Sequence, residues 1–162
     1  MAKASSVFGR LRNRLWNNHH ASTSVKCKFY SAIVLSTLLY GAETWTLYRS
    51  KVKKLHAFMM RHLRAIMKIS WQDKVTQIEV LQRVGLPSME DLLIRKNLRW
   101  TGHILQMESD RLRKKVLYSQ LSDGVRKRGR PLLRYKDTIK RNLKKRDINI
   151  NQLAELTQQR IA

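Results

Sequence analysis

Acidic residues are the first candidates for catalysis in this sequence, and there are few of them. The 162 residues include 11 Asp and Glu. Paired carboxylates can act as acid and base or hold metal ions, and the one adjacent pair here is Glu90-Asp91. It follows Ser88, a typical helix-starting residue, so its acids lie where the helix dipole favours negative charge. The predicted role of this pair is structural.

Other catalytic or metal-binding arrangements are also missing from the sequence. Cys27 is the only cysteine, which excludes an intrachain disulfide and a cysteine-rich zinc site and is typical of an intracellular protein. The five histidines show no ligand spacing, and no phosphate-binding loop or nucleophile motif occurs. The sequence therefore predicts a chain that is not an enzyme by itself, with no cofactor and no metal.

The basic residues offer a different chemistry. Thirty-four Lys and Arg give a net charge of +23, and the isoelectric point is about 11.0. Like charge at this density repels itself and is typical of proteins that meet a polyanion, because each neutralised phosphate releases counterions. Solubility or an anionic membrane surface are alternative uses. The longest apolar run, 32–40, is far shorter than the roughly 20 residues of a membrane span. Nucleic acid is the predicted partner, with no membrane.

The sharpest basic cluster is Arg126-Lys127-Arg128-Gly129-Arg130-Pro131. Its Arg-Gly-Arg-Pro centre is similar to the AT-hook, which inserts arginines into a narrow minor groove. A basic turn held to phosphates, or only solvated, is the plainer interpretation. The cluster also fits a nuclear-import signal, so the predicted location is the nucleus.

Aromatic side chains are a further candidate for binding, because bases stack on them. Trp45, Trp71 and Trp100 each lie in or beside an apolar helical pattern. Since a tryptophan buries a large area, the sequence favours core packing over stacking for all three.

These residues must be positioned by helices, because the apolar spacing is helical almost everywhere and no alternating run predicts a strand. We expect a first helix near 7–15, a second from a Ser24 cap to 40 ending at Gly41, and a third from a Ser50 cap to about 69. Thr76–Glu79 resembles a capping box, with Gly85 as the stop. Ser88 opens a helix to about 107.

The remaining elements are shorter. Asp110 is expected to cap a short helix, and Pro131 to begin one carrying Leu132, Tyr135 and Ile139. A last helix is expected within 151–160. The predicted fold is all-α, an irregular bundle of about six to seven helices with a basic, partly flexible C-terminal segment. The expected domains are a helical region 1–118, a basic connector 119–131 and a basic helical segment 132–162.

Several strings of residues stand in a recognisable order: YSAIVLSTLLYGAETW at 30–45, LRWTGHILQM at 98–107 and RGRPLLRYKD at 128–137. Together with 8–11, 71–73 and 80–87, they resemble the C-terminal part of reverse transcriptases from LINE-type non-LTR retrotransposons. The resemblance covers residues 7 to about 150.

This resemblance implies a thumb and post-thumb region, whose helices grip the template–primer duplex. The palm of that family binds two metal ions through a Tyr/Phe-x-Asp-Asp motif, which this sequence lacks. The resemblance therefore implies a truncated piece of such a polymerase, with the missing palm as a partner.

The predicted function is phosphate-directed binding of RNA, DNA or their hybrid. Charge clustering selects two sets of contact residues: Lys51, Lys54, Arg61 and Arg64 on a thumb-like face, and Arg126, Lys127, Arg128, Arg130, Arg134 and Lys140 in the tail. Three alternatives stay open: an active polymerase or nuclease, an AT-hook-like chromatin protein, and a remnant of a decaying element without function.

Overall fold

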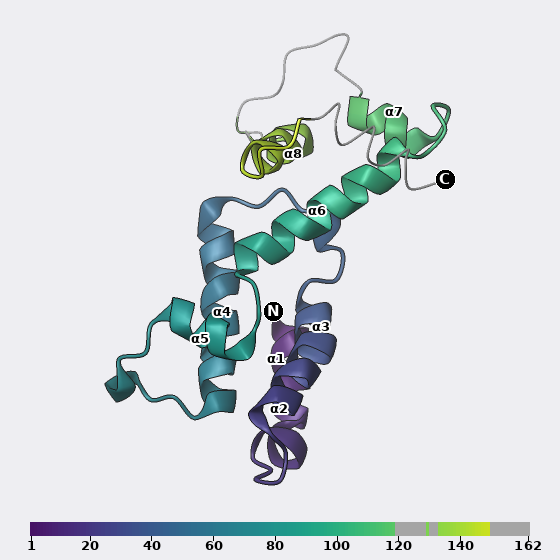
Figure 1. Cartoon of the computed structure of the whole chain (residues 1–162). Helices are drawn as coiled ribbons and strands as arrows, with labels where there is room; N and C mark the ends of the chain where they lie inside the picture. The colour runs from purple at the N-terminus through teal and green to yellow at the C-terminus, as the bar shows by residue number, and fades with distance from the viewer. Residues whose placement is uncertain (119–128, 130–132, 150–162) are drawn as a thin grey trace. The chain divides into compact units, whose positions relative to one another are not determined.

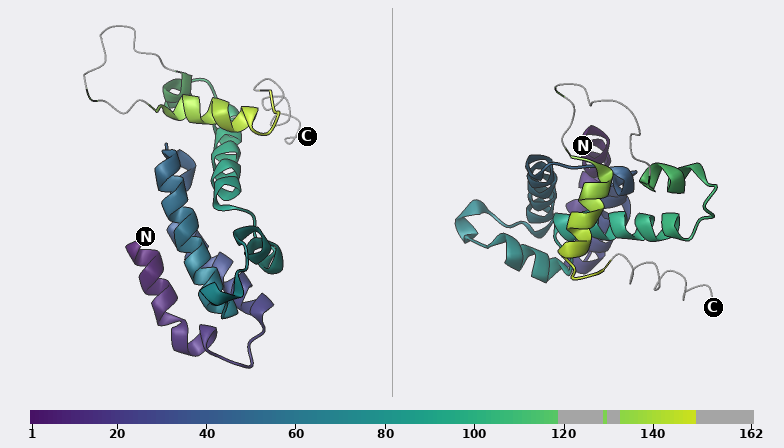
Figure 2. Two further views of the ribbon diagram at one scale, coloured as in Figure 1. Left: turned by 90° about the vertical axis from the view of Figure 1, so that its left-hand side faces the viewer. Right: turned by 90° about the horizontal axis from the view of Figure 1, so that it is seen from above.

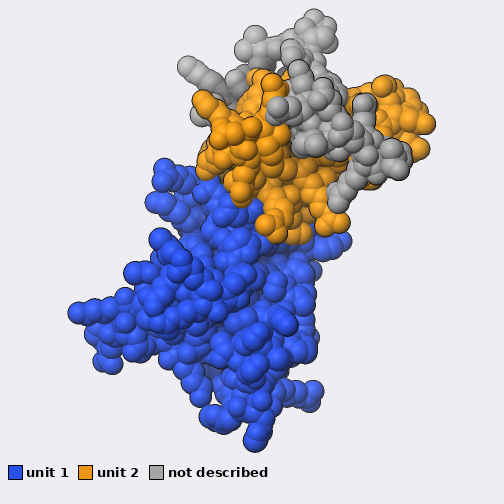
Figure 3. Space-filling model, viewed as in Figure 1, with its two compact units in different colours: residues 1–41, 49–92 blue, residues 42–48, 93–162 orange. Residues whose placement is uncertain are grey.

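The structure is a computed structural model, and it describes residues 1–118, 129 and 133–149. Within these ranges the secondary structure is helical, and none of the described residues forms a β-strand, as Figure 1 shows. The prediction of an all-α fold is confirmed. The chain divides into two compact units, residues 1–41 with 49–92 (unit 1) and residues 42–48 with 93–162 (unit 2), coloured separately in Figure 3.

Unit 1 begins with α1 (Ala2–Arg10), which a π-helical turn at Arg12–Trp16 follows. A second helical run consists of α2 (Thr23–Phe29), a π-helical segment (Tyr30–Leu35) and α3 (Ser36–Leu38). This run contacts α1, and α2 also contacts α4 (Arg49–Met67) (Figure 2). The predicted second helix is thus confirmed, and Gly41 has the positive φ of 70° expected after its end.

An aromatic cluster forms the centre of unit 1. The ring of Phe8 stacks on Trp16 at a centroid distance of 5.1 Å and on His62 at 4.0 Å. Tyr30 and Phe58 meet the His62 ring edge-on at 5.9 and 4.2 Å. Edge-on and offset contacts of this kind suit the charge distribution of aromatic rings. The cluster joins α1, the second helical run and α4, three elements far apart in the sequence.

Two polar groups are buried in this cluster without a hydrogen-bond partner among the described residues: the Tyr30 hydroxyl and His62 Nδ1. Burial and, to a smaller extent, the neighbouring positive charge of Arg61 lower the pKa of His62 to about 4. Burial also raises the pKa of Tyr30 above its ordinary range. Both side chains are therefore neutral at pH 7.

The second helical run also buries Lys26 and Cys27. The Lys26 ammonium donates a hydrogen bond of 3.0 Å to the carbonyl of Trp16. This side chain therefore has a structural contact and is not part of the exposed basic surface. Burial raises the pKa of the Cys27 thiol. The cap of this run is Ser22, whose hydroxyl accepts from the Val25 N–H, and the prediction of Ser24 was wrong by two residues.

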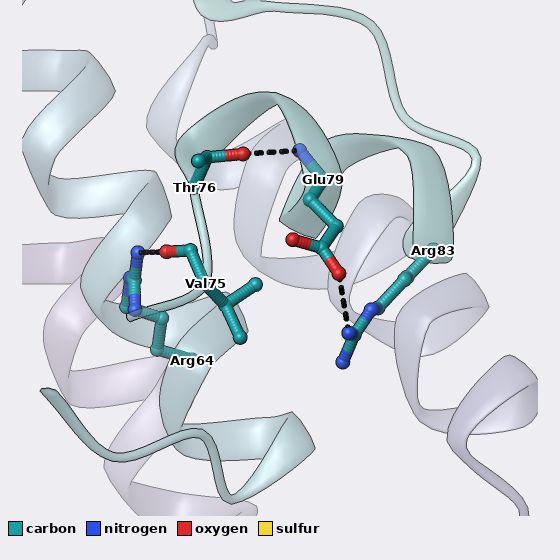
Figure 4. Close-up of polar contacts among 5 residues, drawn as sticks. All are labelled: Arg64, Val75, Thr76, Glu79 and Arg83. Atoms are coloured by element: carbon teal, nitrogen blue, oxygen red, sulfur yellow. Dashed lines mark hydrogen bonds and ion pairs between the residues drawn. The ribbon is translucent and has the colours of Figure 1, made fainter. Parts of the chain in front are cut away.

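The helix α5 (Gln77–Val84) packs on α4 and has well-defined ends. The Thr76 hydroxyl accepts a hydrogen bond of 3.2 Å from the Glu79 N–H, and the Glu79 carboxylate pairs with Arg83, as Figure 4 shows. Gly85 closes the helix with a φ of 68°. The predicted start and stop of this helix are confirmed, whereas of the predicted capping box the structure has the Thr76 half, since the Glu79 carboxylate pairs with Arg83.

Replacing Thr76 by Ala should lower the free energy of unfolding by about 1 kcal/mol, because the Glu79 N–H loses its acceptor. Urea denaturation of the two proteins measures this difference. Thr76→Ser keeps the hydroxyl and serves as the control. An unchanged stability in the Ala variant would show that water replaces the cap without cost.

Unit 2 contains a 3₁₀ turn (Ala42–Thr44), most of α6 (Met89–Leu105), α7 (Leu112–Tyr118) and α8 (Tyr135–Lys144). A buried polar network joins three of these elements. The Asn97 amide donates to the carbonyl of Glu43 at 2.6 Å, and the Asn142 amide donates to Asn97 Oδ1 at 3.2 Å. The Tyr135 hydroxyl also donates to the Glu43 carbonyl, at 2.9 Å.

Three predicted helix starts differ from the structure. α4 begins at Arg49, so Ser50 lies within the helix. α7 begins at Leu112, after Arg111, so the expected cap at Asp110 is one residue early. α8 begins at Tyr135, and Arg134 before it is extended, so Pro131 is not its first residue. The predicted turn at Asp123-Gly124 and the helix at 151–160 lie outside the described residues.

Candidate nucleic-acid interface

The helix α4 buries seven side chains and exposes several cations. Its buried residues are Leu55, Phe58, Met59, Met60, His62, Leu63 and Ile66. Beside them, the exposed side chains of Lys51, Lys54 and Arg61 fall within about 80° of arc on a helix of 100° per residue, an arc that the buried Phe58 also enters. We call these three residues the α4 basic face. The helix carries no Asp or Glu, so nothing on α4 itself neutralises this face.

Arg64, the fourth residue predicted for this face, has a structural contact instead. It is half-buried, and its guanidinium donates a hydrogen bond of 2.6 Å to the carbonyl of Val75, as Figure 4 shows. The contact ties α4 to the residue that precedes the Thr76 cap of α5. No sequence pattern indicates this contact, because the acceptor is a backbone group eleven residues away.

In unit 2, α8 presents a second basic face. Its buried side consists of Thr138, Ile139, Asn142 and Leu143. The exposed side carries Lys140, Arg141 and Lys144 within about 100° of arc, and we call these the α8 basic face. Asp137 is exposed beside them. The contacts of Tyr135 and Asn142 fix how this helix is rotated within unit 2, and burial raises the pKa of Tyr135.

The structure also exposes basic residues on α6 that the sequence pattern did not single out. Arg95, Arg99 and His103 follow one another at intervals of four and are all exposed. The buried residues of α6 include Leu93, Ile94, Asn97, Thr101 and Ile104. Lys96 and Trp100, on the same helix, are only half-buried. If Asn97 and Thr101 are assigned to the buried side of the helix, Arg95, Arg99 and His103 fall on the exposed side.

Lys114 is a further cation with a structural contact. Its ammonium donates to the carbonyls of Leu105 and Met107, at 3.2 and 2.7 Å, and so satisfies acceptors at the C-terminal end of α6. This position also places positive charge where the helix dipole favours it.

The tail residues predicted to bind are only partly within the described ranges. Arg134 and Lys140 are exposed, at the N-cap of α8 and on the α8 basic face. Arg126, Lys127, Arg128 and Arg130 lie outside the described residues.

The tryptophans divide differently from the sequence expectation. Trp16 is buried and its indole N–H donates to the Phe8 carbonyl at 2.8 Å. Trp45 and Trp100 are half-buried, and the Arg113 guanidinium lies 5.6 Å from the Trp100 ring centroid. Trp71 is 83% exposed, so the prediction that it packs in a core was wrong. No apolar element of unit 1 covers its side of the turn.

Within the described ranges, no group of three or more His, Cys, Asp or Glu side chains is arranged to hold a metal ion. None of the helices described is both long enough and apolar enough to cross a membrane. What the described surface does offer is ammonium and guanidinium groups on helix faces, which bind phosphate oxygens.

These features define a small, strongly basic, all-helical protein. Over 129 residues it is 24% identical to a transposon-derived protein of Caenorhabditis elegans. The alignment covers 76% of this chain and 46% of the relative, so the chain spans about half the length of that protein. No family model matches the chain, and no solved structure matches it. The distant similarity to a transposon-derived protein agrees with the resemblance seen in the sequence at this coarser level.

Proposed function

We propose that this chain binds nucleic acid through the phosphate backbone, with little discrimination between sequences. The observation that carries the proposal is the α4 basic face, three exposed cations on a helix of 19 residues without an acid. Phosphate contacts from such groups position a protein on nucleic acid but carry no sequence information directly. The net charge of +23 supplies the long-range attraction.

We further propose that the chain corresponds to the thumb and post-thumb region of a reverse transcriptase of the LINE type. The support is the order of strings at 30–45, 98–107 and 128–137, together with the similarity to a transposon-derived protein. In this role the α4 basic face contacts the template–primer duplex. The partner that completes the enzyme is a palm domain carrying the metal-binding aspartates.

We assign no catalytic step to this chain by itself. Two-metal phosphoryl transfer needs carboxylates that share a site, and the acids with described contacts have other roles. Asp73 and Glu79 lie at helix starts, and Asp91 accepts from the Ser88 hydroxyl at 2.7 Å. Location in the nucleus is part of the proposal and depends on the basic cluster 126–131.

Reversing two charges of the α4 basic face tests the proposal. The variant Lys54→Glu/Arg61→Glu should bind a labelled duplex about 10- to 100-fold more weakly at low salt, and its salt slope should fall by about two. Fluorescence anisotropy measures both quantities. Both side chains are exposed, so the fold is retained.

The matched control is Lys3→Glu/Lys28→Glu, which makes the same change in net charge at exposed positions on α1 and α2. It should weaken binding less than the α4 variant does. Equal losses from the two variants would mean that only total charge matters and that α4 is not an interface. No binding by the unmodified protein would reject the nucleic-acid proposal as a whole.

A further inference from the structure

The exposed Trp71 lies in a turn that is well ordered without help from its side chain. Trp71, Gln72 and Asp73 form a single 3₁₀ turn between α4 and α5. The Ser70 N–H donates to Asp73 Oδ2 at 2.7 Å, and the Ser70 hydroxyl accepts in return, which completes a capping box. The indole is 83% exposed above this turn.

The backbone on both sides of the turn has an unusual conformation. Lys68 and Lys74 have φ values of 55° and 48°, in the left-handed region that side-chain-bearing residues seldom adopt. The Arg64 contact to Val75 holds the chain just after the second of them. Strained residues persist only where the surroundings fix them, and they are frequent at sites that bind ligands. The turn therefore holds Trp71 outward as a fixed feature.

The charges around Trp71 complement a phosphate chain. Lys68 and Lys74 are exposed, three residues before and three residues after it. Asp73, the acid in this segment, is engaged in the capping box. Arg61 of the α4 basic face lies two turns of helix before Lys68. An exposed aromatic ring between cations is the arrangement by which single-strand-binding proteins stack bases and hold the intervening phosphates.

Comparison with Tyr40 shows why Trp71 stands out. Tyr40 is as exposed, at 86%, but its neighbours are Leu38, Leu39, Gly41 and Ala42, which carry no charge. Both rings offer faces on which a base can stack, so the flanking charge is what distinguishes Trp71. Its exposed aromatic face is flanked by two lysines, and these lysines favour a polyanion over an apolar protein surface.

We propose that Trp71 is a stacking platform for an unpaired nucleobase, and that Lys68 and Lys74 hold the phosphates on either side of that nucleotide. This inference rests on the proposed nucleic-acid function and deepens it, because it adds single-stranded segments to the substrates. A duplex offers no unpaired base to Trp71, so the two kinds of binding can be separated by experiment.

The test compares binding of an oligothymidylate of about 20 nucleotides with binding of a duplex of about 20 base pairs. Trp71→Leu should weaken oligothymidylate binding about 10-fold, since it removes the aromatic face, and should change duplex binding by less than about twofold. Trp71→Phe keeps a smaller aromatic face and should restore most of the affinity. Ile78→Ala, at a side chain 70% exposed on α5, is the control for loss of apolar surface.

Tryptophan fluorescence gives an independent readout. Oligothymidylate should quench the unmodified protein more than the Trp71→Phe variant, because stacking acts on the missing indole. Unchanged oligothymidylate affinity in Trp71→Leu would overturn the inference and leave duplex binding intact. Self-association that is lost in Trp71→Leu, with unchanged oligothymidylate affinity, would assign Trp71 to a protein interface instead. If the unmodified protein bound neither probe, the proposed function itself would fail.

Discussion

The affinity of this protein for duplex DNA is expected to fall by about 10³ to 10⁵ when the salt concentration rises from about 50 to about 200 mM. The reason is counterion release, because each phosphate that a cation neutralises frees condensed ions. This range corresponds to roughly 6 to 10 phosphate contacts. The basic faces of α4 and α8, with Arg95 and Arg99 on α6, supply eight exposed cations. The plot of log affinity against log salt concentration measures the number engaged.

Duplexes rich in A·T and in G·C base pairs should give the same slope and nearly the same affinity, since the contacts are to phosphates. A nearly flat salt dependence would contradict phosphate-directed binding. A preference for the A·T-rich duplex that disappears in Arg128→Ala/Arg130→Ala would favour the AT-hook-like alternative, because arginines in a narrow minor groove read its width.

The second large effect is a loss of folding stability at acidic pH. Folding keeps His62 neutral by lowering its pKa from 6.5 to about 4. The unfolded chain therefore binds a proton that the folded chain resists. Stability is fully present above pH 6.5 and is lost as the pH falls toward about 4. The full shift corresponds to about 3 kcal/mol in the free energy of unfolding.

Urea denaturation at several pH values measures this loss, because urea does not screen the protein's charges as a salt denaturant would. His62→Phe keeps a ring between Phe8 and Phe58 and cannot titrate, so its stability should fall much less over the same interval. His19→Gln removes an exposed imidazole and leaves His62 in place, so the loss should persist. Equal losses in the unmodified and His62→Phe proteins would assign the acid effect to overall charge repulsion.

Features of the fold that depend on neighbouring residues were predictable from the sequence. The Thr76 cap, the Ser88 start and the positive φ of Gly41 and Gly85 each involve residues within one helical turn. The apolar stripe of α4 was also predictable, because its spacing is that of a helix. The exact start of α2 was not predictable. Ser22 and Ser24 can both cap a helix, and the packing of the whole helical run determines that Ser22 is the cap.

The candidate site was predictable only in part, because much of it depends on contacts distant in sequence. Lys51, Lys54 and Arg61 share a face, as charge clustering indicated, but Arg64 is held by a backbone carbonyl. Trp71 was expected in a core because of its size, and whether an indole is covered depends on elements elsewhere in the chain. The pairing of Asn97 with Asn142, 45 residues apart, likewise has no local signal.

The absence of any acid from α4 has a consequence for the energetics of the folded state. Neighbouring cations on one helix repel one another, and no intrahelical ion pair offsets this repulsion. A polyanion lying along the helix would remove it, and would do so only in the folded form, where the cations share a face. Occupancy should then be thermodynamically linked to folding, so that the strand acts as a stabilising ligand as well as a substrate.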